Sequence, residues 1–146
     1  MVSMVLTDTP FTKVFLSIRL AAFAAPALSA TARLLSVFVF VAFHTSIAMD
    51  TSIIDRMCVK NGWSRSFFHA GNVVVHVLPF VDALASNECE IQSIDVVLSV
   101  AIFAWWTAFQ TQWLCYDHIY VHMVPLVWYV SHVTGLAGVL ALWCVR

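Results

Sequence analysis

Histidines recur at helical spacing in two apolar stretches of the chain, and imidazole is the side chain best suited to proton transfer and metal binding near neutral pH. His69, Asn72 and His76 are separated by three and then four residues. The same alternation continues later, through His118, His122, Pro125, Tyr129 and His132. Residues three and four apart lie on one face of an α-helix. The pattern therefore predicts two helices that each carry a polar stripe.

Two further apolar stretches carry polar residues at compatible positions. Ser36 and His44 are eight residues apart in one, and Asp95, Ser99 and Gln110 lie near a common stripe in the other. An ionisable group in hydrocarbon costs at least a few kcal/mol, so such groups turn inward and pair with one another or bind a ligand. We therefore expect four helices with one polar face each to enclose a shared polar interior, with His76 as its most deeply placed ionisable group.

The histidine spacing is also compatible with haem or metal binding. His118 and His132 are on one face, at a spacing that resembles the bis-histidine helices of b-type cytochromes. His69 and His76 are only seven residues apart, so at most one haem could be bridged, for example from His76 to His132. With His76, the histidines His122 and His132 are the candidate ligands for a cofactor. The sequence identifies no particular cofactor, and no carboxylate or thiolate completes an evident metal-ligand set.

The composition indicates an integral membrane protein. Of 146 residues, 62% are hydrophobic and 10% are charged, and the mean hydropathy is +0.90. Soluble domains carry about 25% charged residues. The net charge of −1 gives no indication of a nucleic-acid partner. The expected partners are membrane lipids, with subunits of a membrane complex or a second copy of the chain as further alternatives.

Four stretches have the length and composition of membrane spans, which need about 20 apolar residues. They cover residues 34–49, 66–85, 93–114 and 119–145, and the first is short enough that its helix should extend back past Arg33. We therefore predict an all-α fold, a transmembrane bundle of about four spans over residues 33–146. In this topology Cys58 and Cys115 lie on one side of the membrane, and Cys89 and Cys144 lie on the other.

Residues 1–32 form a separate N-terminal segment with two interpretations. Lys13 and Arg19 among many Ser, Thr and Ala residues, with Asp8 as the one acid, are typical of a targeting segment. Alternatively, an apolar stripe predicts an interfacial helix. The stripe consists of Phe11, Val14, Phe15, Ile18 and Ala22.

A family resemblance arises from the stretch VLPFV at residues 77–81, which follows the histidines and Asn72. A Trp-rich stretch then ends at Trp113, and Pro125 comes 46 residues after Pro79. These features resemble the distal half of the androgen-induced-protein family of multi-pass membrane hydrolases of fatty-acid esters. The resemblance implies a histidine that acts with a hydroxyl on another membrane helix. In that family the histidine lies five residues before the proline, where this chain has Val74, and the threonine corresponds loosely to Ser36. The helix containing His76 and Pro79 also resembles small membrane proteins of large algal DNA viruses.

Three classes of function follow from these observations. In an intramembrane lipid hydrolase, Ser36 or Thr45 would be the nucleophile, His76 the base, and Asn72 an orienting group or oxyanion donor. A haem or metal protein would use the helical histidines. A non-catalytic membrane component needs only spans and hydrogen bonds between helices, and the sequence favours this third class because it contains no sharp catalytic motif. An approach of Ser36 or Thr45 to His76 would distinguish the first class.

Overall fold

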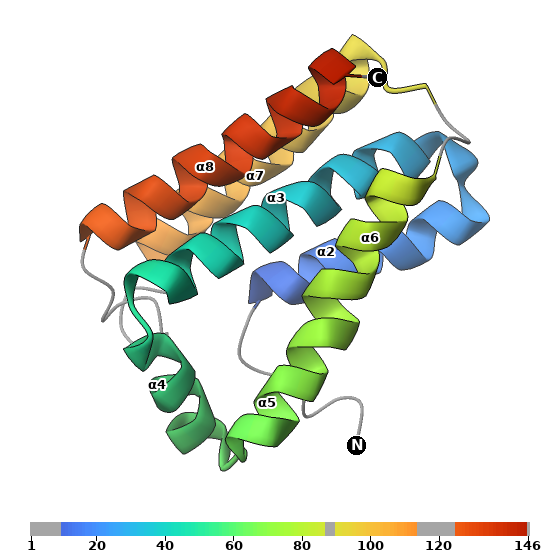
Figure 1. The fold of residues 1–146 in the computed structure, drawn as a ribbon. Helices are drawn as coiled ribbons and strands as arrows, with labels where there is room; N and C mark the ends of the chain where they lie inside the picture. Colours follow the sequence, from blue (N-terminus) through green and yellow to red (C-terminus); the bar gives the residue numbers. More distant parts are fainter. Residues whose placement is uncertain (1–9, 87–89, 114–124, 146) are drawn as a thin grey trace.

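The computed structural model describes the backbone of residues 10–86, 90–113 and 125–145, and within these it describes most side chains. The described chain is helical throughout, with short connections, and contains no strand (Figure 1). The helices are, in order, α2 (Pro10–Ala24), the short 3₁₀ helix η1 (Pro26–Leu28), α3 (Ser29–Met49), α4 (Ser52–Asn61), α5 (Arg65–Asn72), η2 (Val73–Val77), α6 (Leu78–Ala85), α7 (Ser93–Trp113) and α8 (Pro125–Val145). The predicted all-α fold is confirmed for these residues.

Helix α3 lies at the centre and contacts α2, α6, α7 and α8 (Figure 1). Its residues from Ala30 to Val39 are buried without interruption, which is the pattern of a helix surrounded on all sides. The prediction that this helix extends back past Arg33 is confirmed, since it begins at Ser29.

Helices α3 and α8 are antiparallel and approach closely. Contacts pair Ser46 with Ser131 near one end and Val37 with Gly138 further along, so residue numbers fall in α3 as they rise in α8. At Gly135 an added Cβ would lie 2.7 Å from a ring carbon of Phe38. Small residues at a helix crossing allow backbones to approach in this way.

The stretch from Arg65 to Ala85 is one continuous helix with an irregular turn at its centre. Segment η2 is a π-helix, in which the N–H of Leu78 bonds the carbonyl of Val73, five residues earlier. Pro79 follows directly and has no N–H to donate, which favours an irregular hydrogen-bond pattern at this point. A π turn takes up one extra residue, and such turns are frequent at functional sites.

Helix α4 lies between the first two predicted spans, where no helix was predicted. It ends at Gly62, whose φ of 65° is left-handed, and the N–H of Trp63 bonds the carbonyl of Cys58. These are features of a glycine-capped helix end. At its start, the pKa of Asp50 is lowered by a hydrogen bond from the side chain of Ser52, and then by Arg56.

The buried face of α4 carries a pattern from which the helix could have been predicted. Ile53, Met57 and Cys58 join Phe43 and Phe68 in one apolar cluster. Apolar residues four and five apart, with Gly62 after the last turn, are an amphipathic-helix signal. That signal was present in the sequence, but the mixed charge of the stretch obscured it.

Two helices are long and apolar enough to cross a bilayer: Pro26–Met49, which joins η1 to α3, and Arg65–Ala85, which comprises α5, η2 and α6. They correspond to the first two predicted spans. Helices α7 and α8 correspond to the third and fourth, and their apolar parts with described side chains, Ser93–Trp105 and Tyr129–Val145, are shorter. The predicted fourth span began at residue 119, and its first six residues lie outside the described part of the chain.

Large apolar side chains point outward from the α5–α6 stretch, α7 and α8. They include Val74, Leu78 and Val81 on the first, Val97 and Trp105 on α7, and Val133 and Leu140 on α8. Soluble proteins rarely expose large contiguous apolar patches.

Helix α2 packs on this bundle through Phe15 and Ile18, two members of the predicted stripe. Phe15 is 1% exposed and belongs to the same buried cluster as Leu34 and Leu35 of α3, and Ile18 packs against that cluster. Residues Pro10–Ala24 are thus helical and packed on α3 by apolar contacts, while the choice between an interfacial helix and a targeting segment stays a prediction.

Candidate functional site

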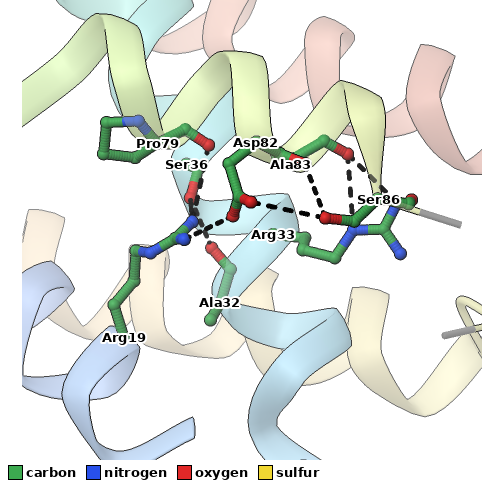
Figure 2. Close-up of polar contacts among 8 residues, drawn as sticks. All are labelled: Arg19, Ala32, Arg33, Ser36, Pro79, Asp82, Ala83 and Ser86. Carbon is green, nitrogen blue, oxygen red and sulfur yellow. Dashed lines mark hydrogen bonds and ion pairs between the residues drawn. The ribbon is translucent and has the colours of Figure 1, made fainter. Parts of the chain in front are cut away.

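Two arginines, Arg19 and Arg33, form hydrogen bonds and an ion pair at the end of the bundle where α2, α3 and α6 meet (Figure 2). Arg33 lies in the second turn of α3 and is 4% exposed. Its guanidinium donates to the carbonyl of Ala83 at 3.0 Å and also to the carbonyl of Ser86. These carbonyls lie at the C-terminal end of α6, which carries partial negative charge. The partial negative charge of this helix end thereby stabilises the buried guanidinium.

Arg19 reaches from α2 to both neighbouring helices. One guanidinium nitrogen donates to the hydroxyl of Ser36 at 2.9 Å, and the other forms an ion pair with Asp82 at 2.5 Å (Figure 2). Ser36 in turn donates to the carbonyl of Ala32, within its own helix, at 2.8 Å. The Ser36 hydroxyl therefore already has a donor and an acceptor.

Hydroxyl and carboxyl groups join the other helices in the same way. Thr31 of α3 donates to buried Asp95 of α7 at 3.1 Å. Ser46 of α3 donates to Ser131 of α8 at 2.7 Å, and Thr134 of α8 donates to Thr45 at 3.2 Å. The interior polar groups of α3 thus bond to each helix packed against it.

A further cluster lies where α3 meets the π-helical segment, and we call His44, Asn72 and His76 the histidine cluster. The ring of His76 stacks on that of Phe43, with centroids 4.1 Å apart, and meets the ring of His44 edge-on at 6.5 Å. Asn72 Nδ2 lies 3.3 Å from His44 Nε2. His44 Nδ1 lies 2.8 Å from the carbonyl of Phe40, which can only accept, so Nδ1 donates and Nε2 accepts the bond from Asn72.

Two polar atoms of the histidine cluster are buried without a hydrogen-bond partner among the described residues. They are His76 Nδ1 and Asn72 Oδ1. Buried polar atoms are nearly always bonded, so each exception calls for a physical account. Ser99 Oγ and Arg56 Nε are also buried without a partner among the described residues, but only in the histidine cluster do two such atoms lie on neighbouring turns of one helix.

The residues predicted for hydrolysis do not come together. The contacts of His76 on α3 are with Phe43 and His44, seven and eight residues beyond Ser36, or roughly 10–12 Å along the helix axis. Ser36 is bonded to Arg19, and Thr45 faces α8. Asn72 lies beside His44, which in turn contacts His76, so an amide that could orient a base is present. Neither Ser36 nor Thr45 contacts His76, however, so the nucleophile of the predicted hydrolase is not in place.

The residues predicted to bind a cofactor are only partly described. His132 of α8 packs against Phe38 of α3 and Phe103 of α7, with centroids 6.2 and 5.3 Å apart. Helix α3 passes between α8 and the α5–α6 stretch, so His132 and His76 contact it on different sides (Figure 1). His118 and His122 lie outside the described residues.

The predicted stripe of the α5–α6 stretch is correct for two of its three members. Asn72 and His76 face α3, whereas His69 is exposed, so the prediction that it faces the interior is wrong. Sequence reasoning did not predict that Arg19 and Arg33 bond between helices, since it used Arg19 only as a mark of the N-terminal segment and Arg33 only as a residue next to the first span. Arg33, one residue before a predicted span, was the available signal.

Comparisons of the chain with protein-family models, with curated proteins and with solved structures find no match.

Proposed function

We propose that this protein is a small integral membrane component with four spans, α3, the α5–α6 stretch, α7 and α8, whose interior polar groups hold the helices together and do not turn over a substrate. The observation that carries the proposal is the pairing of these groups. Arg33, Thr31, Ser46 and Thr45 each bond a different helix from their own. A polar group already bonded between helices must break that bond before it can act on a substrate.

The outward apolar surface supports the membrane environment. Val74, Leu78 and Val81 are 63%, 56% and 52% exposed along one helix. Burial of a valine or leucine side chain contributes about 1.5–3 kcal/mol in water, and these three side chains would lack that contribution if the helix faced water. In lipid, outward apolar groups and inward bonded polar groups are the favourable arrangement.

The direct partners under this proposal are membrane lipids, with a second copy or other subunits as further partners. The hydrolase predicted from the sequence has no contact here that favours it, because both candidate hydroxyls are bonded away from His76.

The test is membrane integration together with topology. Single cysteines are introduced by Val59→Cys in α4 and Val145→Cys at the end of α8, in a chain whose native cysteines are replaced by serine or alanine. Both positions are more than 80% exposed. We expect the protein to stay in the pellet after alkaline carbonate extraction, and an impermeant maleimide to modify one variant in sealed vesicles.

Permeabilised vesicles, in which both variants should react, are the control. Release of the chain by carbonate would contradict membrane integration. Equal labelling of both positions in sealed vesicles would contradict a topology that separates the ends of α3.

A further inference from the structure

The histidine cluster contains ring nitrogens and an amide oxygen whose hydrogen bonds among the described residues are long or absent, and the proposed function does not require these atoms. His44 Nε2 has its lone pair directed at Asn72, because its other nitrogen is held by the carbonyl of Phe40. His76 Nδ1 is buried without a hydrogen-bond partner in the described chain. Metal-binding histidines commonly have their second ring nitrogen fixed by a backbone carbonyl, as His44 does.

The spacing of the two rings fits one bound ion. Two imidazoles on opposite sides of an ion, each with a metal–nitrogen bond of roughly 2 Å, place their ring centroids about 6 Å apart. The centroids of His44 and His76 are 6.5 Å apart. The separation of the two rings is therefore close to that of a pair of imidazoles bound to one ion.

Asn72 can rearrange to suit such an ion. Its contact with His44 Nε2 is long, at 3.3 Å, and its Oδ1 has no partner among the described residues. The oxygen and nitrogen of an amide are assigned from hydrogen bonding. Rotation of this amide by a half turn would direct Oδ1 at an ion held between the rings, as a weak third ligand.

The charge of the ion follows from the surroundings. Among the described residues, no acidic side chain contacts the cluster, and the rings of Phe40 and Phe43 pack against it. Burying a charge in such a setting is costly, and the cost rises with the square of the charge. A monovalent ion is therefore favoured over a divalent one, and the rings contribute cation–π attraction.

We propose that His44 and His76 bind one Cu(I) ion between α3 and the π-helical segment, with the carbonyl oxygen of Asn72 as a weak third ligand. Imidazole is a good ligand for copper, and Cu(I) accepts two donors in a nearly linear arrangement. Each imidazole binds the ion through an unprotonated ring nitrogen. The inference goes beyond the proposed function, because a membrane component held together by helix contacts needs no metal.

The experiment uses the full chain in detergent under anaerobic conditions, with accessible thiols blocked by N-ethylmaleimide. Cu(I) is supplied from a complex with bicinchoninate, whose colour reports transfer to the protein. X-ray absorption at the copper edge gives the ligand atoms. We expect one equivalent of copper with nitrogen neighbours, and the loss of that equivalent in His44→Gln and in His76→Gln.

The matched controls are His69→Gln, on the same helix but exposed, and His132→Gln, which contacts Phe38 and Phe103 instead. Both should bind as the unchanged protein does. Absence of copper binding, coordination by sulfur alone, undiminished binding by His76→Gln, or stronger binding of Zn²⁺ would each overturn the proposal. If the glutamine variants fail to fold, the absorption spectrum of the unchanged protein decides by its ligand atoms.

Discussion

Arg33 and Arg19 carry the same charge in different surroundings, and the difference sets what each contributes. Arg33 is almost fully buried, and it donates hydrogen bonds to backbone carbonyls at the end of α6. The side chains of Arg19 and Asp82 are 20% and 54% exposed. Exposed ion pairs contribute only about 0–1 kcal/mol, whereas a hydrogen bond to a charged group contributes about 1.5–3 kcal/mol.

We therefore expect Arg33→Met to lower the free energy of unfolding by about 2 kcal/mol or more, and Arg19→Met to lower it by less. Methionine keeps most of the apolar stem, so the comparison isolates the guanidinium. Denaturant titration in detergent micelles, followed by tryptophan fluorescence, measures both. Equal losses for the two variants would contradict this assignment of roles.

At the scale of the element, the crossing of α3 and α8 depends on one glycine more than on the other. A Cβ at Gly135 would come within 3.0 Å of two ring carbons of Phe38. That ring is held by Phe103 and His132, so it has little room to move. At Gly138 the nearest atoms are methyl groups of Val41 and Val37 at 3.2 and 3.3 Å.

Gly135→Ala should therefore destabilise the protein by about 1–3 kcal/mol through overpacking. Gly138→Ala should be close to neutral, because the small displacement is offset by a gain of about 1 kcal/mol in helix propensity. Melting temperatures of the two variants in detergent check the difference. A greater loss for Gly138→Ala would show that the crossing is arranged differently.

The π-helical segment should tolerate the deletion of one residue better than the regular helix that follows it. Deletion of Val73 removes the extra residue of the π turn, so the helix can become regular while Phe68 stays in its apolar cluster. Deletion of Val81 in regular α6 rotates the two parts of the helix by roughly 100° relative to each other. We expect the first variant to remain folded by size-exclusion chromatography and the second to aggregate. Aggregation of both deletion variants to the same extent would contradict the presence of an extra residue in this turn.

Sequence periodicity was sufficient to place most of the helices but not every face. The extent of the α5–α6 stretch and the start of α7 followed from apolar length and flanking polar residues. The exposure of His69 could not be predicted in this way. A π turn changes the angle between the residues on its two sides, so residues spaced for 3.6 per turn no longer share one face across it. The pairing of His44 with Asn72 could not be predicted either, since spacing within one helix carries no information about which helix lies opposite.

At the scale of the whole molecule, the outward apolar surface has opposite consequences in water and in lipid. Val74 lies at the centre of the Arg65–Ala85 helix and points outward. A lysine at the centre of a membrane helix costs about 3 kcal/mol on insertion. On the surface of a soluble protein the same change is usually within about 0.5 kcal/mol of neutral.

We expect Val74→Lys to reduce the membrane-integrated fraction of the protein, whereas Val59→Lys in α4 should leave it unchanged. Both valines are exposed, so burial does not explain a difference between them. Fractionation after alkaline extraction, with quantitative immunoblotting, measures the integrated fraction. Improved solubility of Val74→Lys without loss of folding would place the surface of this helix in water.

The central position of α3 also sets an order of events during synthesis. Arg33 bonds carbonyls made about 50 residues later, and Ser46 waits for Ser131, 85 residues further along. At about 5–20 residues per second, the ribosome takes several seconds to supply that last partner. Throughout that interval α3 carries polar groups whose final partners do not yet exist. Its release from the insertion machinery into lipid should accordingly be delayed until α8 emerges, and a chain truncated before α8 should remain cross-linkable to that machinery at Ser46.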